Sequence, residues 1–148
     1  MYDADKVVLC LSAGHKTTKN IMARKAFTVS FADAEHVIPA DYVGMVSANS
    51  EPDKLEKSGF HAVKSTKVDA PLIAELPVTL ECTLMKVNED GNIIGKIENV
   101  SVDEAVLDEK GTIDFTKFHP IAFEPAKNGY HVLGERVGNA FSDGSKLK

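Results

Sequence analysis

One alternating stretch constrains the fold of this chain more than any other feature. Over residues 78–84, apolar side chains alternate with threonine and glutamate, so an extended chain has one apolar and one polar face. A second strand-like run, residues 93–100, follows the dipeptide Asp90-Gly91. This dipeptide favours a tight turn because both residues tolerate positive φ. The two runs together predict a long antiparallel β-hairpin.

Shorter segments on both sides of this hairpin predict further strands. Residues 7–11 form a continuous apolar run rich in β-branched side chains, which predicts a buried strand. Residues 27–31 alternate apolar and hydroxyl side chains, which predicts a strand with one face in the core. Residues 121–123 and 130–134 predict two short strands near the C-terminus.

Three short helices are expected between the strands. Thr17 or Thr18 can cap the first helix, which is expected to begin at Lys19 or Asn20. A first-turn proline introduces an amphipathic helix over residues 39–46, and a proline and a glycine bracket another over residues 53–58. Antiparallel strands with short inserted helices predict a mainly β or α+β domain, such as a β-barrel.

Length and charge exclude several classes of protein. No repeat or linker divides the 148 residues, so one domain over residues 1–148 is expected. The 17 basic and 22 acidic residues argue against a nucleic-acid or anionic-membrane partner. Neither a basic leader nor a membrane-length apolar run is present, so a soluble, cytoplasmic protein is expected. Cys10 and Cys82 lie in separate apolar runs, which predicts reduced, buried thiols.

Common catalytic signatures are missing from the sequence. It contains no G-x-S-x-G, H-E-x-x-H, G-x-x-x-x-G-K-[ST] or G-x-G-x-x-G motif. The five histidines do not pair at metal-ligand spacing, so structural or surface roles and no metal site are expected. Acidic doublets at residues 103–104 and 108–109 suit a solvated loop. No catalytic residue can be assigned from these patterns.

The segment over residues 12–20 joins a predicted strand to a predicted helix N-terminus. It carries three hydroxyl groups, two lysines, a histidine and an asparagine amide. Unpaired N–H groups and the helix dipole favour an anion at such a position, which predicts a nucleotide or flavin phosphate site. The spacing fits equally well with Thr17 and Thr18 acting only as helix caps while the lysines face water.

The sequences LSAGHKTTKNI, FTVSF and DYVG, at residues 11–21, 27–31 and 41–44, resemble the flavin reductase-like, FMN-binding split-barrel family, which includes flavoredoxin-like proteins. The similarity continues through the strand around Cys82 and through residues 130–135, and it covers essentially the whole chain. The resemblance implies a split β-barrel of Greek-key type that forms a homodimer and holds FMN noncovalently.

The resemblance also implies which residues bind the cofactor. These residues are Ser12, Ala13, His15, Lys16, Thr17, Thr18, Asn20 and Lys54. The hydroxyls and His15 would face the phosphate, Asn20 would close the loop, and Lys16 or Lys19 would supply positive charge. Lys54 is expected to reach the flavin from a second subunit.

The family reduces flavin with NAD(P)H although it has no Rossmann domain, in agreement with the missing G-x-G-x-x-G motif. The resemblance therefore implies an FMN-dependent NAD(P)H oxidoreductase that passes electrons to flavin, ferric or protein acceptors. Family members carry additional strands before the point that matches Met1, so an amino-terminally truncated barrel with an open edge is expected. Two alternatives stay open: a noncatalytic remnant, and a one-electron carrier that acts through a redox partner protein.

Overall fold

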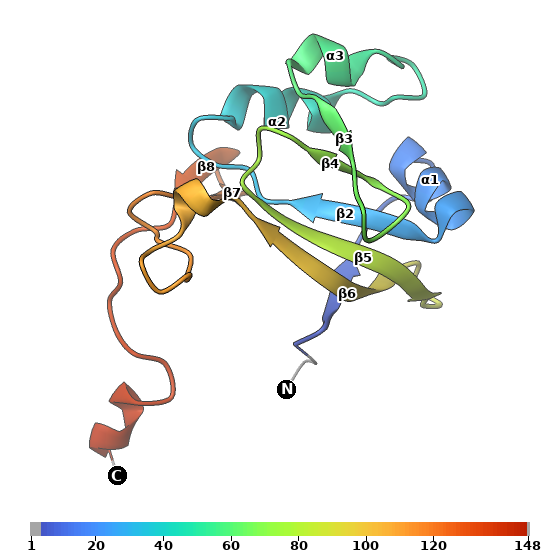
Figure 1. The fold of residues 1–148 in the computed structure, drawn as a ribbon. Helices are drawn as coiled ribbons and strands as arrows, with labels where there is room; N and C mark the ends of the chain where they lie inside the picture. The colour runs from blue at the N-terminus through green and yellow to red at the C-terminus, as the bar shows by residue number, and fades with distance from the viewer. Residues whose placement is uncertain (1–3, 148) are drawn as a thin grey trace.

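The long hairpin is the centre of the structure, a computed structural model that describes residues 4–147. Strands β5 (Val78–Val87) and β6 (Ile93–Val102) pair antiparallel. They form the middle of a four-stranded sheet with the order β1-β6-β5-β2 (Figure 1). The outer strands are β1 (Lys6–Leu9) and β2 (Ala26–Ser30), and both pair antiparallel with their neighbours.

The turn between β5 and β6 is longer than the predicted two-residue turn. Gly91 has a φ of 85°, whereas Asp90 does not adopt positive φ. The Gly91 N–H donates to the Asn88 carbonyl at 2.9 Å, and the Asn88 N–H donates to the Asn92 carbonyl at 2.9 Å. This pattern is a turn closed by a left-handed glycine, in which only the glycine needs positive φ.

The apolar face of the sheet forms the main core. Phe27 from the outer strand β2 and Cys82 from the central strand β5 pack with Ile21 from helix α1 (Lys16–Arg24), and all three are buried. The Phe27 ring occupies the space that a Cβ atom at Gly95 would need, so a glycine is required there. Burial raises the pKa of the Cys82 thiol to about 11.

The prediction of a buried Cys10 thiol is wrong, because Cys10 is exposed. It follows β1, in which the exposed and half-buried side chains alternate. The expectation of a buried strand is therefore also wrong, because no residue of β1 is fully buried. An edge strand covered on one face explains the alternation.

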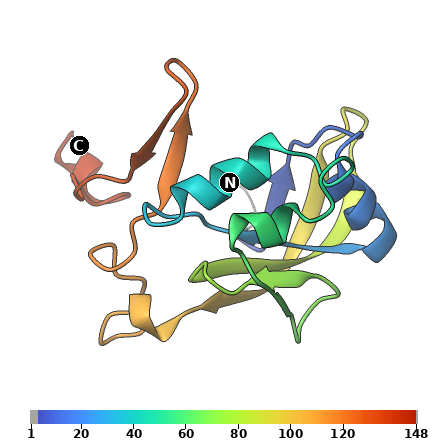
Figure 2. The same ribbon diagram turned by 90° about the horizontal axis from the view of Figure 1, so that it is seen from above.

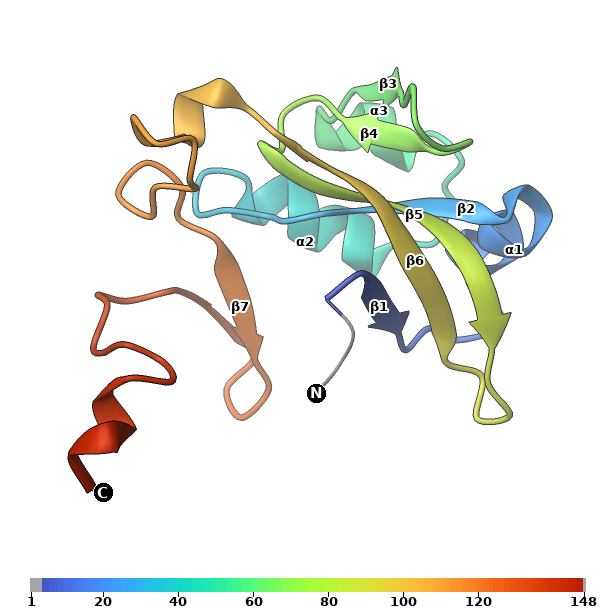
Figure 3. The same ribbon diagram turned by 60° about the horizontal axis from the view of Figure 1, so that its bottom comes forward.

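The remaining elements are shorter. They are α2 (Val37–Met45), α3 (Lys54–Ser58), β3 (Ala62–Lys64), β4 (Pro71–Ile73), the 3-10 helix η1 (Glu104–Val106), β7 (Ile121–Glu124), β8 (Gly129–Val132) and the 3-10 helix η2 (Asp143–Leu147). Strands β3 and β4 form one two-stranded hairpin and β7 and β8 another. The β7–β8 hairpin and the C-terminal segment extend away from the four-stranded sheet (Figures 2 and 3).

Two of the three predicted helices differ from the structure. Helix α1 begins at Lys16 with His15 as its N-cap residue, so neither Thr17 nor Thr18 is the cap. Helix α2 begins at Val37, before the proline, and none of its residues, all of which the structure describes, is fully buried. The third helix, α3, agrees with the prediction and ends at a left-handed glycine.

Candidate cofactor site

The loop between β1 and α1 is held against the first turn of the helix. The Ser12 carbonyl accepts the His15 N–H at 3.1 Å and the Thr18 hydroxyl at 2.7 Å. The Gly14 N–H donates to Ser12 Oγ at 3.4 Å. Thr18 therefore fixes the loop to the helix and does not cap the helix.

The N-terminus of α1 has no side-chain cap. His15 makes no capping hydrogen bond, and no acidic residue lies in the first turn. The Lys19 N–H donates to the His15 carbonyl at 3.3 Å. Because an α-helix pairs each N–H with a carbonyl four residues earlier, the N–H groups of residues 16–18 have no acceptor inside the helix. These donors, with the exposed Lys16 and Thr17 side chains, favour an anion.

The segment between α2 and α3 contacts this loop from the same chain. Asn49 Nδ2 donates to the Gly14 carbonyl at 3.0 Å. Lys54 Nζ donates to the carbonyls of Val43 at 2.7 Å and Val46 at 2.9 Å, and so ties α3 to the end of α2. Sequence reasoning missed Asn49, since no local pattern relates it to the loop. The role expected for Lys54 at the flavin of a second subunit stays a prediction.

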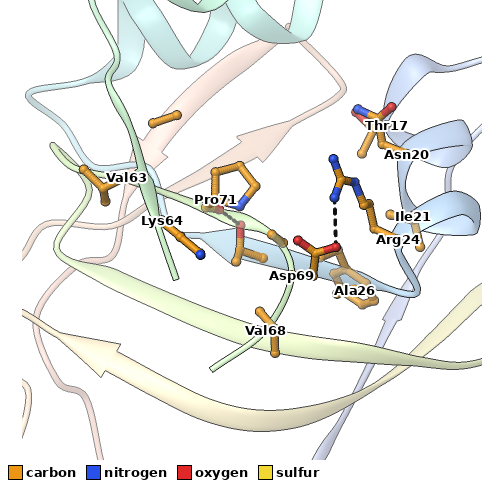
Figure 4. A pocket seen from close by; sticks show the side chains of 14 residues that line it. Thr17, Asn20, Ile21, Arg24, Ala26, Val63, Lys64, Val68, Asp69 and Pro71 are labelled. Atoms are coloured by element: carbon orange, nitrogen blue, oxygen red, sulfur yellow. Dashed lines mark hydrogen bonds and ion pairs between the residues drawn. The ribbon is translucent and has the colours of Figure 1, made fainter. Parts of the chain in front are cut away.

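Two cavities flank α1, and the predicted site residues divide between them. Thr17 and Asn20 line a cavity of about 660 Å³ between α1, β2 and the β3–β4 hairpin (Figure 4). Ser12, Ala13 and Thr18 line a second cavity of about 860 Å³ beside the turn of the β5–β6 hairpin. We call these the first and the second cavity.

The remaining predicted residues lie outside both cavities. His15, Lys16 and Lys54 line neither the first nor the second cavity among the described residues. His15 and Lys16 are exposed at the start of α1, and Lys54 is half-buried. Seven of the eight predicted residues therefore lie on the loop and the first half of α1, and Lys54 lies at the start of α3.

The first cavity has largely apolar walls and a charged rim. Ile21 and Phe27 lie at its inner side. Arg24 and Asp69 face one another across its mouth, with Arg24 Nη1 at 3.0 Å from Asp69 Oδ2 (Figure 4). Both side chains are 66% exposed, so this ion pair contributes little to stability. Lys64 adds a second cation to the lining.

A buried glutamate lies on the polar face of β5. Glu81 is 2% exposed and accepts hydrogen bonds from the hydroxyls of Ser65 and Ser101 and from Asn99 Nδ2. Burial alone raises the pKa of this carboxyl, but the hydrogen bonds from Ser101, Ser65 and Asn99 together lower it, so Glu81 is ionised at neutral pH. The alternation over residues 78–84 placed Glu81 on this face, but no sequence signal indicated that the β3–β4 hairpin covers it.

Two of the five histidines each pair with one carboxylate. His36 Nδ1 lies 2.7 Å from Asp33 Oδ1, and His61 Nδ1 lies 2.5 Å from Glu75 Oε1. Hydrogen bonds from the His61 N–H and ring lower the pKa of the Glu75 carboxyl. Over residues 4–147 there is no group of three or more side chains suited to hold a metal ion. In the same range, no helix combines the length and the apolar character needed to cross a membrane.

Comparison with known proteins identifies the family. A model of the flavin reductase like domain matches residues 2–126. The chain belongs to the flavin reductase-like family. This result confirms the resemblance seen in the sequence.

Individual relatives of this flavin reductase-like protein agree with the assignment. The structure of flavoredoxin of Desulfovibrio vulgaris (Miyazaki F) superposes with a TM-score of 0.89 at 35% identity, over 94% of this chain and 75% of that one. An FMN-binding domain of a flavin reductases-like enzyme from Shewanella baltica superposes with a TM-score of 0.79 at 18% identity, over 90% of this chain and 73% of that one. The predicted mainly β, split-barrel fold is thereby confirmed.

A further relative is longer than this chain. An uncharacterised protein of Aquifex aeolicus (strain VF5) is 30% identical over 122 residues, which is 80% of this chain. The chain spans 62% of the length of that relative.

Proposed function

We propose that this protein binds FMN noncovalently and acts as an oxidoreductase that passes electrons from NAD(P)H to a flavin, ferric or protein acceptor. The uncapped N-terminus of α1 carries the proposal, because its unpaired N–H groups and its basic neighbour Lys16 suit a phosphate. The Shewanella baltica relative is an FMN-binding domain, which supports the choice of flavin.

The first cavity fits the flavin ring. Thr17 and Asn20 extend from the N-terminus of α1 into this cavity, so a ligand anchored by its phosphate can reach it. Its volume of about 660 Å³ lies within the usual range of roughly 300–1,000 Å³ for small-molecule sites. Mostly apolar walls with a few polar groups are also typical of such sites. We therefore place the ring in the first cavity.

The residues around this site would act by binding and by electrostatics. Bound FMN would supply the electron-accepting chemistry, as cofactors do in oxidoreductases. The N–H groups at the start of α1 would hold its phosphate, and the hydrogen bonds of the Ser12 carbonyl keep their loop in place. Arg24 and Lys64 would favour an electron-rich ring, because both cations line the first cavity.

We also propose a homodimer in the cytoplasm. Large apolar side chains are exposed on α2 and on the C-terminal segment: Ile38 is 82% and Met45 77% exposed, and the Phe141 side chain is fully exposed. Exposed apolar side chains on two elements favour an association surface. The lack of a disulfide between exposed Cys10 and buried Cys82 suits a reducing compartment.

The test is an absorption spectrum of the purified protein before and after addition of FMN and removal of the excess. We expect flavin bands that stay with the protein and bleach when NAD(P)H is added. A protein that stays colourless after addition of FMN would contradict the proposal and favour a noncatalytic remnant.

A second candidate is a one-electron carrier, which the 35% identity to the Desulfovibrio flavoredoxin favours. This candidate predicts that the protein retains FMN and that NAD(P)H does not reduce it. A partner flavoprotein would reduce the bound FMN instead.

Two matched substitutions test the position of the ring. Ala62 lines the first cavity and Ala23 lines the second, and both are exposed. Ala62→Phe is expected to weaken FMN binding about tenfold, and Ala23→Phe less than about twofold, because only the first would meet the ring. The reverse result would place the ring in the second cavity.

A further inference from the structure

The buried Glu81 cluster connects the sheet to the wall of the first cavity. Residues 65–70 join β3 to β4, and Val68, Asp69 and Ala70 of this loop line the cavity. Ser65, at the start of the loop, is 3% exposed and donates its hydroxyl hydrogen to Glu81 Oε2. The connection therefore runs from the central strand β5 directly to the start of the cavity wall.

Ser65 also sets the conformation of the loop. Its Oγ accepts the backbone N–H of Lys67 at 2.9 Å and of Val68 at 3.0 Å. One hydroxyl therefore donates to Glu81 and accepts from two backbone amides, which fixes a tight turn. This turn determines where Val68 and Asp69 enter the cavity lining.

The contacts further along the wall are weaker or more exposed. Arg24 and Asp69 form an ion pair with both side chains 66% exposed, which is the geometry of a low-energy surface pair. Thr28 Oγ1 donates to the Pro71 carbonyl at 2.6 Å at an exposed position. Of these three links, only the one between Ser65 and Glu81 is buried. A buried hydrogen bond is electrostatically stronger than an exposed one.

The other half of the cluster holds the Glu81 carboxylate. Asn99 Nδ2 donates to Glu81 Oε1 at 2.7 Å, and the Ser101 hydroxyl donates to the same oxygen. Both residues lie on β6, next to Glu81 in the sheet. They orient the carboxylate and have no contact with the cavity, since neither lines it.

We propose that Glu81 is a positioning residue which, through Ser65, holds the β3–β4 loop as a fixed wall of the first cavity and so supports ligand binding there. The inference rests on the proposed function, because it takes the first cavity as part of the flavin site. Glu81 does not line the first cavity and acts through the hydrogen bond from Ser65.

The experiment compares two serines on one carboxylate. Ser65→Ala removes the hydrogen bond between Glu81 and the β3–β4 loop. Ser101→Ala removes a hydrogen bond to the same carboxylate from β6, which is not part of the cavity wall. We expect Ser65→Ala to weaken FMN binding about fivefold, the equivalent of ~1 kcal/mol, and Ser101→Ala to leave the dissociation constant within about twofold. Ser65→Thr, which keeps the hydroxyl, is expected to restore binding.

A second pair tests the carboxylate itself. Glu81→Gln is expected to weaken FMN binding as Ser65→Ala does. Glu98→Gln is the control, because Glu98 lies on the same hairpin and accepts hydrogen bonds from Thr83 and Lys96, but it is exposed and does not reach the wall. Equal loss of binding in Ser65→Ala and Ser101→Ala, or in both glutamate variants, would mean a general structural role and would overturn the inference.

Amide hydrogen exchange without flavin separates this inference from the proposed function. The N–H groups of Lys67 and Val68 are expected to exchange faster in Ser65→Ala and Glu81→Gln, and at the wild-type rate in Ser101→Ala and Glu98→Gln. Unchanged exchange in all four variants would overturn the positioning role. A wild-type protein that fails to bind FMN overturns the proposed function instead, and the exchange rates still decide whether Glu81 positions the wall.

Discussion

Two polar regions of this molecule differ in how their hydrogen-bonding groups are satisfied. At the start of α1, the side chains are exposed, no side chain caps the helix, and the first N–H groups have no acceptor inside it. Around Glu81, the side chains are buried or half-buried, and no buried side-chain polar atom of the described residues lacks a partner. The difference indicates that the first region is suited to bind an external anion and that the second stabilises the fold.

The largest expected effect is a difference between the two regions in how much a substitution lowers the free energy of unfolding. Glu81→Leu leaves the Ser65 and Ser101 hydroxyls and the Asn99 amide without their acceptor, and we expect a loss of about 3 kcal/mol in the free energy of unfolding. Thr17→Ala, at the exposed end of α1, is expected to change it by less than ~0.5 kcal/mol. Chemical denaturation measures both values, and similar losses would remove the distinction.

Sequence patterns predicted the sheet because apolar and polar residues alternate in the sequences of β2 and β5. Phe27 and Cys82 lie on the buried face that the alternation indicated. The same alternation could not predict that Glu81 is buried, because its cover comes from the β3–β4 hairpin, a tertiary contact without a local pattern. The exposure of Cys10 was missed for a related reason, since a continuous apolar run does not distinguish an edge strand from a central one.

The candidate site was predicted in part. Strand, loop and helix N-terminus follow one another in the sequence, so the loop over residues 12–20 could be located by local reasoning. The start of α1 was misplaced because threonines are common caps, whereas Thr18 bonds back to the Ser12 carbonyl. The contact from Asn49 to Gly14 joins segments 35 residues apart, and nothing in the sequence predicts it.

The second-largest expected effect concerns FMN binding at the N-terminus of α1. Thr17→Glu puts a negative charge in the first turn of α1, where we expect it to repel the phosphate and weaken FMN binding about tenfold. The stability of the fold is not expected to fall, because an acidic side chain interacts favourably with a helix N-terminus. Thr17→Gln is the uncharged control of equal size. Loss of stability without loss of FMN affinity would reverse the roles of the two regions.

A smaller effect concerns pH. The lowered pKa of Glu81 means that its carboxylate stabilises the fold above the ordinary value of 4.5 and that this contribution is lost as the pH falls through the lower, folded value. As the pH falls below the ordinary value of 4.5, the wild-type free energy of unfolding is expected to fall further than that of Glu81→Gln. Other carboxylates, including Glu75, titrate in both proteins, so their contributions cancel. Parallel pH profiles would argue against an ionised Glu81.

The smallest effect concerns the rim of the first cavity. Arg24→Ala removes an exposed ion pair with Asp69, and the free energy of unfolding is expected to change by less than ~0.5 kcal/mol. Thermal or chemical denaturation of Arg24→Ala and Glu81→Leu, measured in parallel, compares the loss of an exposed charge with the loss of a buried one. A loss as large as that of Glu81→Leu would show that the rim holds the wall of the cavity.

The most direct measurement of the central claim, that the N-terminus of α1 binds a phosphate, is a pair of fluorescence titrations of the wild-type protein. One titration uses FMN and the other uses riboflavin, which carries the same ring without the phosphate. Hydrogen bonds to a charged group contribute ~2 kcal/mol, so FMN is expected to bind about 30-fold more tightly. Equal dissociation constants for the two flavins would contradict the account.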